Sequence, residues 1–256
     1  MYVLKFGGTS MGSVDALRRV ADLVFEYGAR GRVAVVVSAM SGITDSLLQA
    51  AGLAANQDEG WAELVSHLEQ RHRSAWRELV PGDVAANPLD EHFAALRTLC
   101  NGIFLLGECS PRSSDRVVAF GELLSSCLFA ALMEPRISTE WADSRLLIVT
   151  DSRFGNAQVD FVASDARINA FFGAARAQVV VLPGFIAANA AGETTTLGRG
   201  GSDYTAAIIG AALPEAEVEI WTDVPGMMTA DPRLVPGART IAALSFQEAM
   251  ELSHFG

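Results

Sequence analysis

The chain of 256 residues carries 30 acidic side chains against 19 Lys plus Arg, a formal net charge of −11. This acidic balance argues against a nucleic-acid binder and against a polybasic membrane-surface protein. Half of the residues are hydrophobic, which favours a large buried core over a disordered chain. The longest apolar runs, Val33–Val37 and Ala206–Leu213, fall short of a membrane span. Three cysteines without a CxxC pair predict reduced thiols in a cytoplasm.

The N-terminal forty residues alternate between strand and helix signals. Tyr2–Phe6 is a short apolar run, and Val14, Leu17 and Ala21 recur at the spacing of one buried helix face. Arg32–Ala39 is β-branched without polar alternation, which is typical of a strand buried on both faces of a parallel sheet. We therefore expect a βαβ unit with a right-handed crossover.

The rest of the chain continues this mixture of helices and strands. Helices are expected over Trp61–Leu79, Glu91–Leu106, Asp115–Met133, Ser164–Arg176, Ser202–Leu213 and Ser245–Phe255, with turns at Pro81-Gly82-Asp83 and Asn87-Pro88. Strands are expected at Leu146–Thr150, Gln178–Leu182 and Glu217–Thr222, and a hairpin joins Ile186–Asn189 to Thr194–Leu197. The pattern predicts one α/β domain over residues 1–256, a three-layer α/β/α sandwich around a mostly parallel sheet. Because no closing strand precedes Gly256, we expect a chain that is cut at a domain edge.

The first candidate site is Lys5-Phe6-Gly7-Gly8-Thr9-Ser10, a strand end followed by glycines and a helix start. Glycines let the backbone approach an anion, and free amides at a helix N-terminus point toward it. The spacing matches neither the P-loop nor the Rossmann fingerprint. The segment therefore fits a phosphate site, and it also fits a tight turn with a solvent-facing lysine.

A second glycine-rich segment, Thr194–Thr205, places Arg199 between glycines and then opens an apolar helix at Ser202-Asp203. A serine N-cap and an acid in the first turn are ordinary helix chemistry, so capping alone explains Ser202 and Asp203. Capping does not explain Arg199. A guanidinium on such a loop suits bidentate capture of a carboxylate or phosphate.

Two further segments and one further residue each allow a functional and a structural interpretation. Ser38–Asp45 follows a strand, and its hydroxyls either hold a small polar substrate or cap the next helix through Ser41 or Thr44. Glu122 lies in an apolar helix, where it either meets a substrate ammonium in the interior or faces solvent. Trp221–Arg233 is a strand end that runs into a turn-rich loop, which suits a nucleotide or an ordinary surface loop.

Other polar residues favour structural roles. The four histidines are scattered without metal-ligand spacing, so no metal site is predicted. The charges across Arg71–Glu78 are expected to form a solvated helix face, and Met227-Met228 is expected to serve packing.

Taken together, the motifs resemble the aspartate kinase family, which has the amino-acid kinase fold. The resemblance covers essentially all 256 residues, and KFGGTS together with LGRGGSDY is its most specific part. The matching segments are KFGGTS (Lys5–Ser10), VVSAMSGITD (Val36–Asp45), FGELLS (Phe120–Ser125), IVTDSRFGNA (Ile148–Ala157), TTTLGRGGSDYTA (Thr194–Ala206) and WTDVPGMMTADPRLVP (Trp221–Pro236).

The resemblance implies ATP-dependent phosphorylation of the β-carboxylate of L-aspartate to 4-phospho-L-aspartate, the first step toward lysine, threonine and methionine. ATP would carry the Mg²⁺. The partners would be small molecules rather than nucleic acid or a membrane, and the chain could form a homo-oligomer. A β-carboxylate with a pKa of about 3.9 is already ionised at neutral pH, so the reaction needs no general base. Catalysis then consists of positioning and positive charge.

The resemblance also assigns roles to single residues. The catalytic pair would be Lys5, on the transferring phosphoryl group, and Asp203, which organises the catalytic lysines. The phosphates would lie on Gly7, Gly8 and Ser10. Aspartate would bind to Ser38, Thr44 and Glu122, the last meeting its α-ammonium, and to Arg199 and Ser202, which match carboxylate-binding positions. The nucleotide loop would comprise Thr222, Asp223, Met228, Asp231 and Arg233.

The sequence departs from the family pattern in three places. Met228 stands where an aromatic residue is frequent, and Asp45 stands where asparagine is frequent. The family continues after Phe255-Gly256 into a segment with a second phosphate-site lysine and then two regulatory domains. We therefore expect a truncated catalytic domain that binds substrates, turns over weakly and lacks feedback inhibition. The alternatives are an inactive ligand-binding fragment and an amino-acid kinase with another acceptor.

Overall fold

The computed structural model describes residues 1–80, 82, 87–224 and 226–255, so Pro81 and Asp83 of the predicted turn lie outside the described residues, as does Gly256. The chain divides into two compact units, Met1–Trp221 and Thr222–Gly256. The first unit contains β1 (Tyr2–Phe6), α1 (Val14–Arg30), β2 (Val33–Val37), α2 (Ile43–Ala55), α3 (Gly60–Leu79), α4 (Pro88–Leu106), α5 (Pro111–Met133), β3 (Thr139–Trp141), α6 (Ser144–Leu147), β4 (Val149–Thr150), α7 (Phe161–Ala174), β5 (Val179–Pro183), β6 (Ile186–Asn189), β7 (Thr194–Thr196), α8 (Gly201–Ala212) and β8 (Glu217–Trp221). The second contains α9 (Phe246–Phe255).

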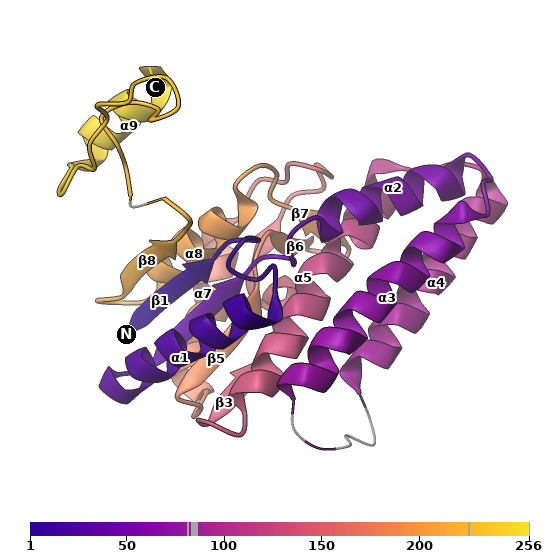
Figure 1. Cartoon of the computed structure of the whole chain (residues 1–256), viewed down its shortest axis with the longest axis horizontal. Coiled ribbons are helices and arrows are strands. Elements are labelled where there is room, and N and C mark those ends of the chain that lie inside the picture. The colour runs from indigo at the N-terminus through magenta and orange to yellow at the C-terminus, as the bar shows by residue number, and fades with distance from the viewer. Residues whose placement is uncertain (81, 83–86, 225, 256) are drawn as a thin grey trace. The chain divides into compact units, whose positions relative to one another are not determined.

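Five parallel strands form the central sheet of the first unit, in the order β3-β5-β2-β1-β8 (Figure 1). Tyr2 of β1 lies opposite Val33 of β2 on one side and Glu217 of β8 on the other. A second sheet, β4-β6-β7, contains the predicted antiparallel hairpin. The mostly parallel sheet predicted from the β-branched runs is therefore confirmed.

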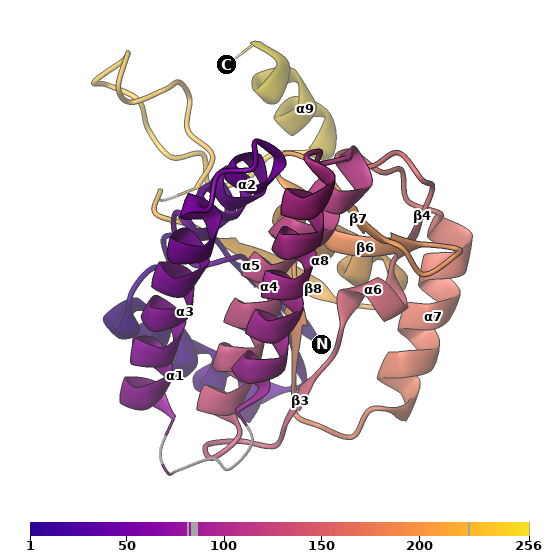
Figure 2. The same cartoon turned by 90° about the vertical axis from the view of Figure 1, so that its right-hand side faces the viewer.

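Side-chain alternation along the strands separates two hydrophobic cores. Val33, Val35 and Val37 of β2 pack into the core shared with α1 to α5, whereas Ala34 and Val36 pack into the core shared with α7 and α8. Figures 1 and 2 show these helices on the two sides of the sheet. This arrangement confirms the three-layer α/β/α sandwich.

Helix α5 is the central helix of the larger core. By length and composition it could cross a membrane, but 78% of its most apolar window is buried inside the protein, as in the core helix of a soluble protein. Gly121 brings α5 close to the loop after β2, because a Cβ at Gly121 would lie 2.9 Å from Cβ of Ala39. One turn later, Ser125 Oγ donates a hydrogen bond to the carbonyl of Ser38, 2.8 Å away. The helix therefore fixes the loop that follows β2.

The local structure differs from the expectations at the predicted strand Leu146–Thr150, at β3, and at the starts of α4 and α5. The strand predicted over Leu146–Thr150 is the end of the short helix α6 followed by the two-residue strand β4, because the Asp143 side chain accepts a hydrogen bond from the backbone of Arg145 and starts a helix. Strand β3, at one edge of the sheet, was not predicted. The starts of α4 and α5 also lie earlier than expected, where Asn87 and Ser110 act as N-caps before proline.

Candidate active site

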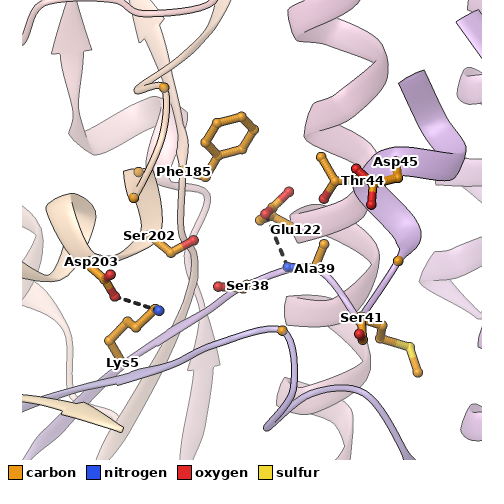
Figure 3. Close-up of a pocket in the computed structure, with 16 residues that line it drawn as sticks. Lys5, Ser38, Ala39, Ser41, Thr44, Asp45, Glu122, Phe185, Ser202 and Asp203 are labelled. Atoms are coloured by element: carbon orange, nitrogen blue, oxygen red, sulfur yellow. Dashed lines mark hydrogen bonds and ion pairs between the residues drawn. The ribbon is translucent and has the colours of Figure 1, made fainter. Parts of the chain in front are cut away.

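Loops at the carboxyl ends of β1 and β2 meet the start of α8 around a cavity of about 410 Å³ (Figure 3). Seven of the predicted site residues line it: Lys5, Gly8, Ser38, Thr44, Glu122, Ser202 and Asp203. Lys5 and Asp203 lie at one side, Thr44 at the other, and Ser38 and Glu122 between them. Four segments that are far apart in the sequence thus form one polar cavity.

Lys5 is the penultimate residue of β1 and its side chain is buried, with Nζ 2.5 Å from Oδ1 of Asp203. Gly7 lies beside the same ammonium, since a Cβ at Gly7 would be 3.4 Å from Nζ. Lys5 is also the only lysine among the 19 cationic residues of the sequence. The solvent-facing alternative for Lys5 is therefore excluded, and the cavity holds a buried ammonium with one carboxylate partner.

The beginning of α8 is not capped by a side chain. Its N-cap is Gly200, whose φ of +71° is in the left-handed region that favours glycine. Ser202 is instead buried in the first turn, against Gly184, where a Cβ would lie 2.7 Å from Cβ of Ser202. Asp203 pairs with Lys5. The capping explanation for Ser202 is therefore wrong, and the first N–H of the helix, on Gly201, donates to the carbonyl of Gly198, 3.0 Å away.

The same holds for the loop after β2. The N-cap of α2 is Gly42, with a φ of +79° and no capping side chain. Ser41 and Thr44 therefore do not cap this helix, and both line the cavity. Asp45, the residue that departs from the family pattern, lines it as well and is exposed.

Glu122 is buried, with 4% of its surface exposed, and faces the cavity from α5 (Figure 3). Its Oε1 accepts a hydrogen bond from the backbone N–H of Ala39, 3.2 Å away, whereas Oε2 has no partner within the described part of the chain. Burial raises the pKa of Glu122 to about 8. The solvent-facing alternative is thus excluded. A buried carboxylate oxygen without a partner favours a cationic ligand, which restores its ionised form.

Arg199 lies at the rim of this site. The glycines on either side, Gly198 and Gly200, line the cavity in left-handed conformations, but Arg199 itself is exposed and is not a lining residue. Gly7 and Ser10, which were also predicted, are not lining residues either. The structure therefore brings residues 198–200, the arginine loop, to the cavity without placing the guanidinium of Arg199 inside it.

Two residues at the site were not predicted. Phe185 lines the cavity with a φ of +67°, a conformation that is held by a hydrogen bond from its N–H to Oγ1 of Thr205. Arg71 on α3 donates to the carbonyls of Ser41, at 2.8 Å, and Gly12, at 3.1 Å, so it joins the loops after β1 and β2. Arg71 is exposed, as expected of a solvated helix face, and its guanidinium also makes these two hydrogen bonds. The one sequence feature that pointed to Phe185 was the glycine, Gly184, in the turn between β5 and β6. No feature of the sequence pointed to Arg71.

The predicted nucleotide loop belongs to the second unit. Within that unit, Met228, Asp231 and Arg233 line a cavity of about 570 Å³. The Arg233 guanidinium lies 2.7 Å from the Asp231 carboxylate and lowers its pKa. Thr222 donates to Asp223, 3.1 Å away. Pro225, in the same motif, lies outside the described residues.

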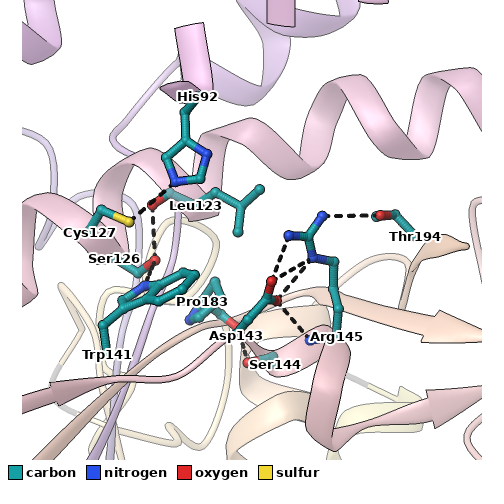
Figure 4. A network of polar contacts seen from close by, with 10 residues as sticks. All are labelled: His92, Leu123, Ser126, Cys127, Trp141, Asp143, Ser144, Arg145, Pro183 and Thr194. Carbon is teal, nitrogen blue, oxygen red and sulfur yellow. Dashed lines mark hydrogen bonds and ion pairs between the residues drawn. The ribbon is translucent and has the colours of Figure 1, made fainter. Parts of the chain in front are cut away.

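A polar network outside the first cavity joins α4, α5 and the second sheet (Figure 4). Sγ of Cys127 lies 3.4 Å from Nε2 of His92, but burial raises the pKa of the Cys127 thiol to about 12 and lowers that of His92. The pair is therefore a neutral thiol and a neutral imidazole rather than an activated nucleophile. Arg145, held 2.6 Å from Asp143, donates to Oγ1 of Thr194 in β7. We assign this network a structural role.

Comparison with known proteins places these features in a family. The family model for the amino acid kinase family matches residues 1–256, and the chain therefore belongs to the amino acid kinase family.

Its relatives include aspartokinases, which confirms the resemblance found in the motifs. Lysine-sensitive aspartokinase 3 of Escherichia coli is 38% identical over 258 residues, which cover 99% of this chain and 56% of the relative. A chloroplastic bifunctional aspartokinase/homoserine dehydrogenase of Zea mays is 35% identical over 99% of this chain and 28% of its own length. The crystal structure of E. coli aspartokinase III with aspartate and ADP matches with a TM-score of 0.88 and 36% identity, covering 100% of this chain and 56% of the other. The chain thus spans between about a quarter and just over half of the relatives it matches.

Proposed function

We propose that this chain catalyses the ATP-dependent phosphorylation of the β-carboxylate of L-aspartate, as the catalytic part of an aspartate kinase. The observation that carries the proposal is one cavity that holds both a buried ammonium, on Lys5, and a buried carboxylate with a free oxygen, on Glu122. The aspartokinase relatives, one of them solved with aspartate and ADP, support it.

The free oxygen of Glu122 is the proposed partner of the substrate α-ammonium. A cation there would satisfy the orphaned oxygen and offset the cost of burying the charge. The hydroxyls of Ser38 and Thr44, which line the same cavity, would donate to the substrate carboxylates. Ser202, in the first turn of α8, and Arg199, on the rim, would bind the α-carboxylate, the guanidinium by turning inward from its exposed position. These contacts select a small amino acid that carries a second carboxylate.

In the transfer step, an oxygen of the β-carboxylate attacks the γ-phosphorus of ATP, and the bond from that phosphorus to the bridging oxygen breaks. ADP leaves with the electron pair, and no proton has to be removed. Lys5 would hold the transferring phosphoryl group, and Asp203 would orient the lysine across their 2.5 Å contact. The backbone at Gly7, Gly8 and Ser10 would cradle the phosphates. Gly8 packs close to the loop after β2, since a Cβ there would lie 3.4 Å from the carbonyl oxygen of Ala39, in ordinary van der Waals contact.

The remaining assignments extend the same proposal. Thr222, Asp223, Met228, Asp231 and Arg233 would contact the nucleotide. Mg²⁺ would arrive on ATP, since this ion usually keeps several waters and binds through substrate phosphates. The product would feed lysine, threonine and methionine synthesis. The free cysteines suit a reducing cytoplasm, although the plant relatives are chloroplastic.

The test is ADP formation by the purified chain with MgATP, with and without L-aspartate, together with hydroxylamine trapping of the acyl phosphate. We expect ADP and aspartyl hydroxamate to appear only with L-aspartate. Acetylglutamate, glutamate and UMP serve as competing acceptors, and a clear preference for one of them would replace aspartate as the substrate. Background ADP from a folded sample with every acceptor would instead favour a binding fragment.

Two lysine variants and one arginine variant complete the test. Lys5→Ala should lower turnover by at least about 100-fold while the protein remains folded, because it removes the charge on the transferring group. Arg18→Ala removes an equal charge from the exposed face of α1, where Arg18 pairs with Asp15, and should leave turnover within about twofold. Lys5→Arg keeps the charge and distinguishes a need for an ammonium from a need for any cation.

A further inference from the structure

Asp115 is a buried carboxylate that the proposed reaction does not use. It lies in the second turn of α5, with 3% of its surface exposed. Its Oδ2 accepts hydrogen bonds from the backbone N–H groups of Gly155, at 2.9 Å, and Thr196, at 3.0 Å, and its Oδ1 accepts one from Oγ1 of Thr196, at 3.0 Å. One side chain therefore holds both the loop before α7 and the last residue of β7.

These two held segments are the support of the arginine loop. After Thr196, the N–H of Leu197 donates to the carbonyl of Phe185, 2.9 Å away, and Gly198 lies directly on the side chain of Asn156. A Cβ at Gly198 would approach Oδ1 of Asn156 to 2.5 Å, so a side chain is excluded at this position. The chain is thus hydrogen-bonded at Thr196 and Leu197, the two residues that precede Gly198 and Arg199.

Asp115 and Glu122 also share a helix. They are seven residues apart on α5, about two turns, so both carboxylates project from the same face about 10 Å apart along the axis. Glu122 contacts the loop after β2, whereas Asp115 contacts the strand that leads to Arg199. Helix α5 therefore connects the two halves of the cavity through two buried carboxylates.

We propose that Asp115 is a positioning residue for the acceptor, which sets the Gly198–Ser202 segment at the correct distance from Glu122. The proposal rests on the proposed function, since it concerns the part of that same site that would bind the phosphoryl acceptor, L-aspartate. Without the three hydrogen bonds, the segment would sample many positions, and each substrate would pay the ordering cost on binding. The three hydrogen bonds of Asp115 go to Gly155 and Thr196 and not to the proposed phosphate-binding residues Gly7, Gly8 and Ser10, so KM for ATP should be spared.

The experiment compares three variants in the full 256-residue chain. Asp115→Asn keeps the size of the side chain but places an amide N–H against backbone donors. Thr196→Val removes only the hydroxyl that donates to Oδ1, whereas Thr196→Ser retains it. The control is Gln178→Ala, which removes a 2.7 Å hydrogen bond to the carbonyl of Gly28 before the amino end of β5, away from the cavity.

Two measurements decide the result: amide hydrogen exchange of residues 197–201 in the free protein, and KM for L-aspartate and for ATP. We expect Asp115→Asn and Thr196→Val to speed this exchange at least about 10-fold and to raise KM for aspartate about 5- to 20-fold, with KM for ATP within about twofold. Thr196→Ser should behave like the wild type. Gln178→Ala should lower Tm without moving either quantity.

Unchanged exchange at residues 197–201 in a folded Asp115→Asn or Thr196→Val chain overturns the proposal, as does an equal rise of both KM values. If Asp115→Asn does not fold, the Thr196→Val and Thr196→Ser pair decides alone. The exchange measurement needs no substrate, so it decides the role of Asp115 even if the wild-type chain transfers nothing to aspartate. A wild-type chain that transfers no phosphoryl group to aspartate would overturn the proposed function instead.

Discussion

Glu122 should link acceptor binding to the release of a proton. Burial raises the pKa of this carboxyl to about 8, so at neutral pH the free protein holds it mostly protonated. A substrate ammonium beside the unpartnered oxygen stabilises the ionised form. Because the α-ammonium of a free amino acid keeps its own proton over this range, the proposed binding of L-aspartate below pH 8 should expel the proton of Glu122.

The size of the effect follows from this pKa. With a pKa of about 8, the ionised share of free Glu122 rises from about 3% at pH 6.5 to about 76% at pH 8.5. The apparent affinity scales with the share of the protein that is competent to bind, so KM for aspartate should fall by roughly 25-fold between these two pH values. Binding should release about one proton at pH 6.5 and about a quarter of a proton at pH 8.5.

Calorimetric titration of L-aspartate in two buffers of different ionisation enthalpy measures the released protons directly. Glu122→Gln keeps the shape of the side chain but cannot ionise, so it should bind aspartate more weakly, release no proton and show a flat pH profile. Asp45→Asn, at an exposed carboxyl that lines the same cavity, should still release the proton. Wild-type binding at pH 6.5 without proton release, or an unchanged pH slope in Glu122→Gln, would refute the reasoning.

Three further changes test other parts of the structure. Burial lowers the pKa of His72 to about 4, so the native state favours the neutral ring and loses about 3 kcal/mol of stability as pH falls from 6.5 to 4. His72→Leu should remove this loss, measured as the free energy of unfolding in urea at each pH. If the loss is unchanged in the variant, His72 is not its source. Gly184→Ala should push Ser202 out of place, because the added Cβ would lie 2.7 Å from Cβ of Ser202, and should raise KM for aspartate about 10-fold or more; a kinetically normal variant would show that Ser202 yields. Arg71→Gln should loosen both loops whose carbonyls it holds and raise KM for both substrates by roughly 3- to 10-fold; an effect on Tm alone would contradict this.

The fold was predictable where the sequence pattern is controlled by burial on both faces of the sheet. β1, β2 and β5 are apolar or β-branched runs, and each appears within a residue or two of the expected bounds. β3 has three partly exposed residues at the sheet edge, too few to show a period. At residues 146–150 the apolar composition suited both a strand and a helix, and the cap at Asp143 decided for the helix.

The candidate site was predictable as a set of loops, but less so as a set of side chains. The motifs follow strands β1 and β2, and the carboxyl ends of parallel strands lie at one edge of a sheet, so the parallel sheet accounts for their convergence. The burial of Glu122 was not decided by the sequence, because α5 is buried nearly all around and lacks a polar face that would orient it. Arg71 and Asp115 act on backbone groups that are 59 and 81 residues away in the sequence, and no local pattern records such contacts.

The cation content of the chain is an independent argument that Lys5, in the first candidate site, has a role in binding an anion. One lysine stands among 19 cationic residues, so wherever a positive charge serves solubility or a surface ion pair, this chain uses arginine. The single ammonium lies at the end of β1, buried, 2.5 Å from Asp203 and beside Gly7. A guanidinium is planar, wider and fixed in a fork, whereas an ammonium is a compact charge with three donors that can follow a moving group. Under the proposed function, the anion at this position would be a phosphoryl group that moves during transfer, and a lysine would suit it better than an arginine.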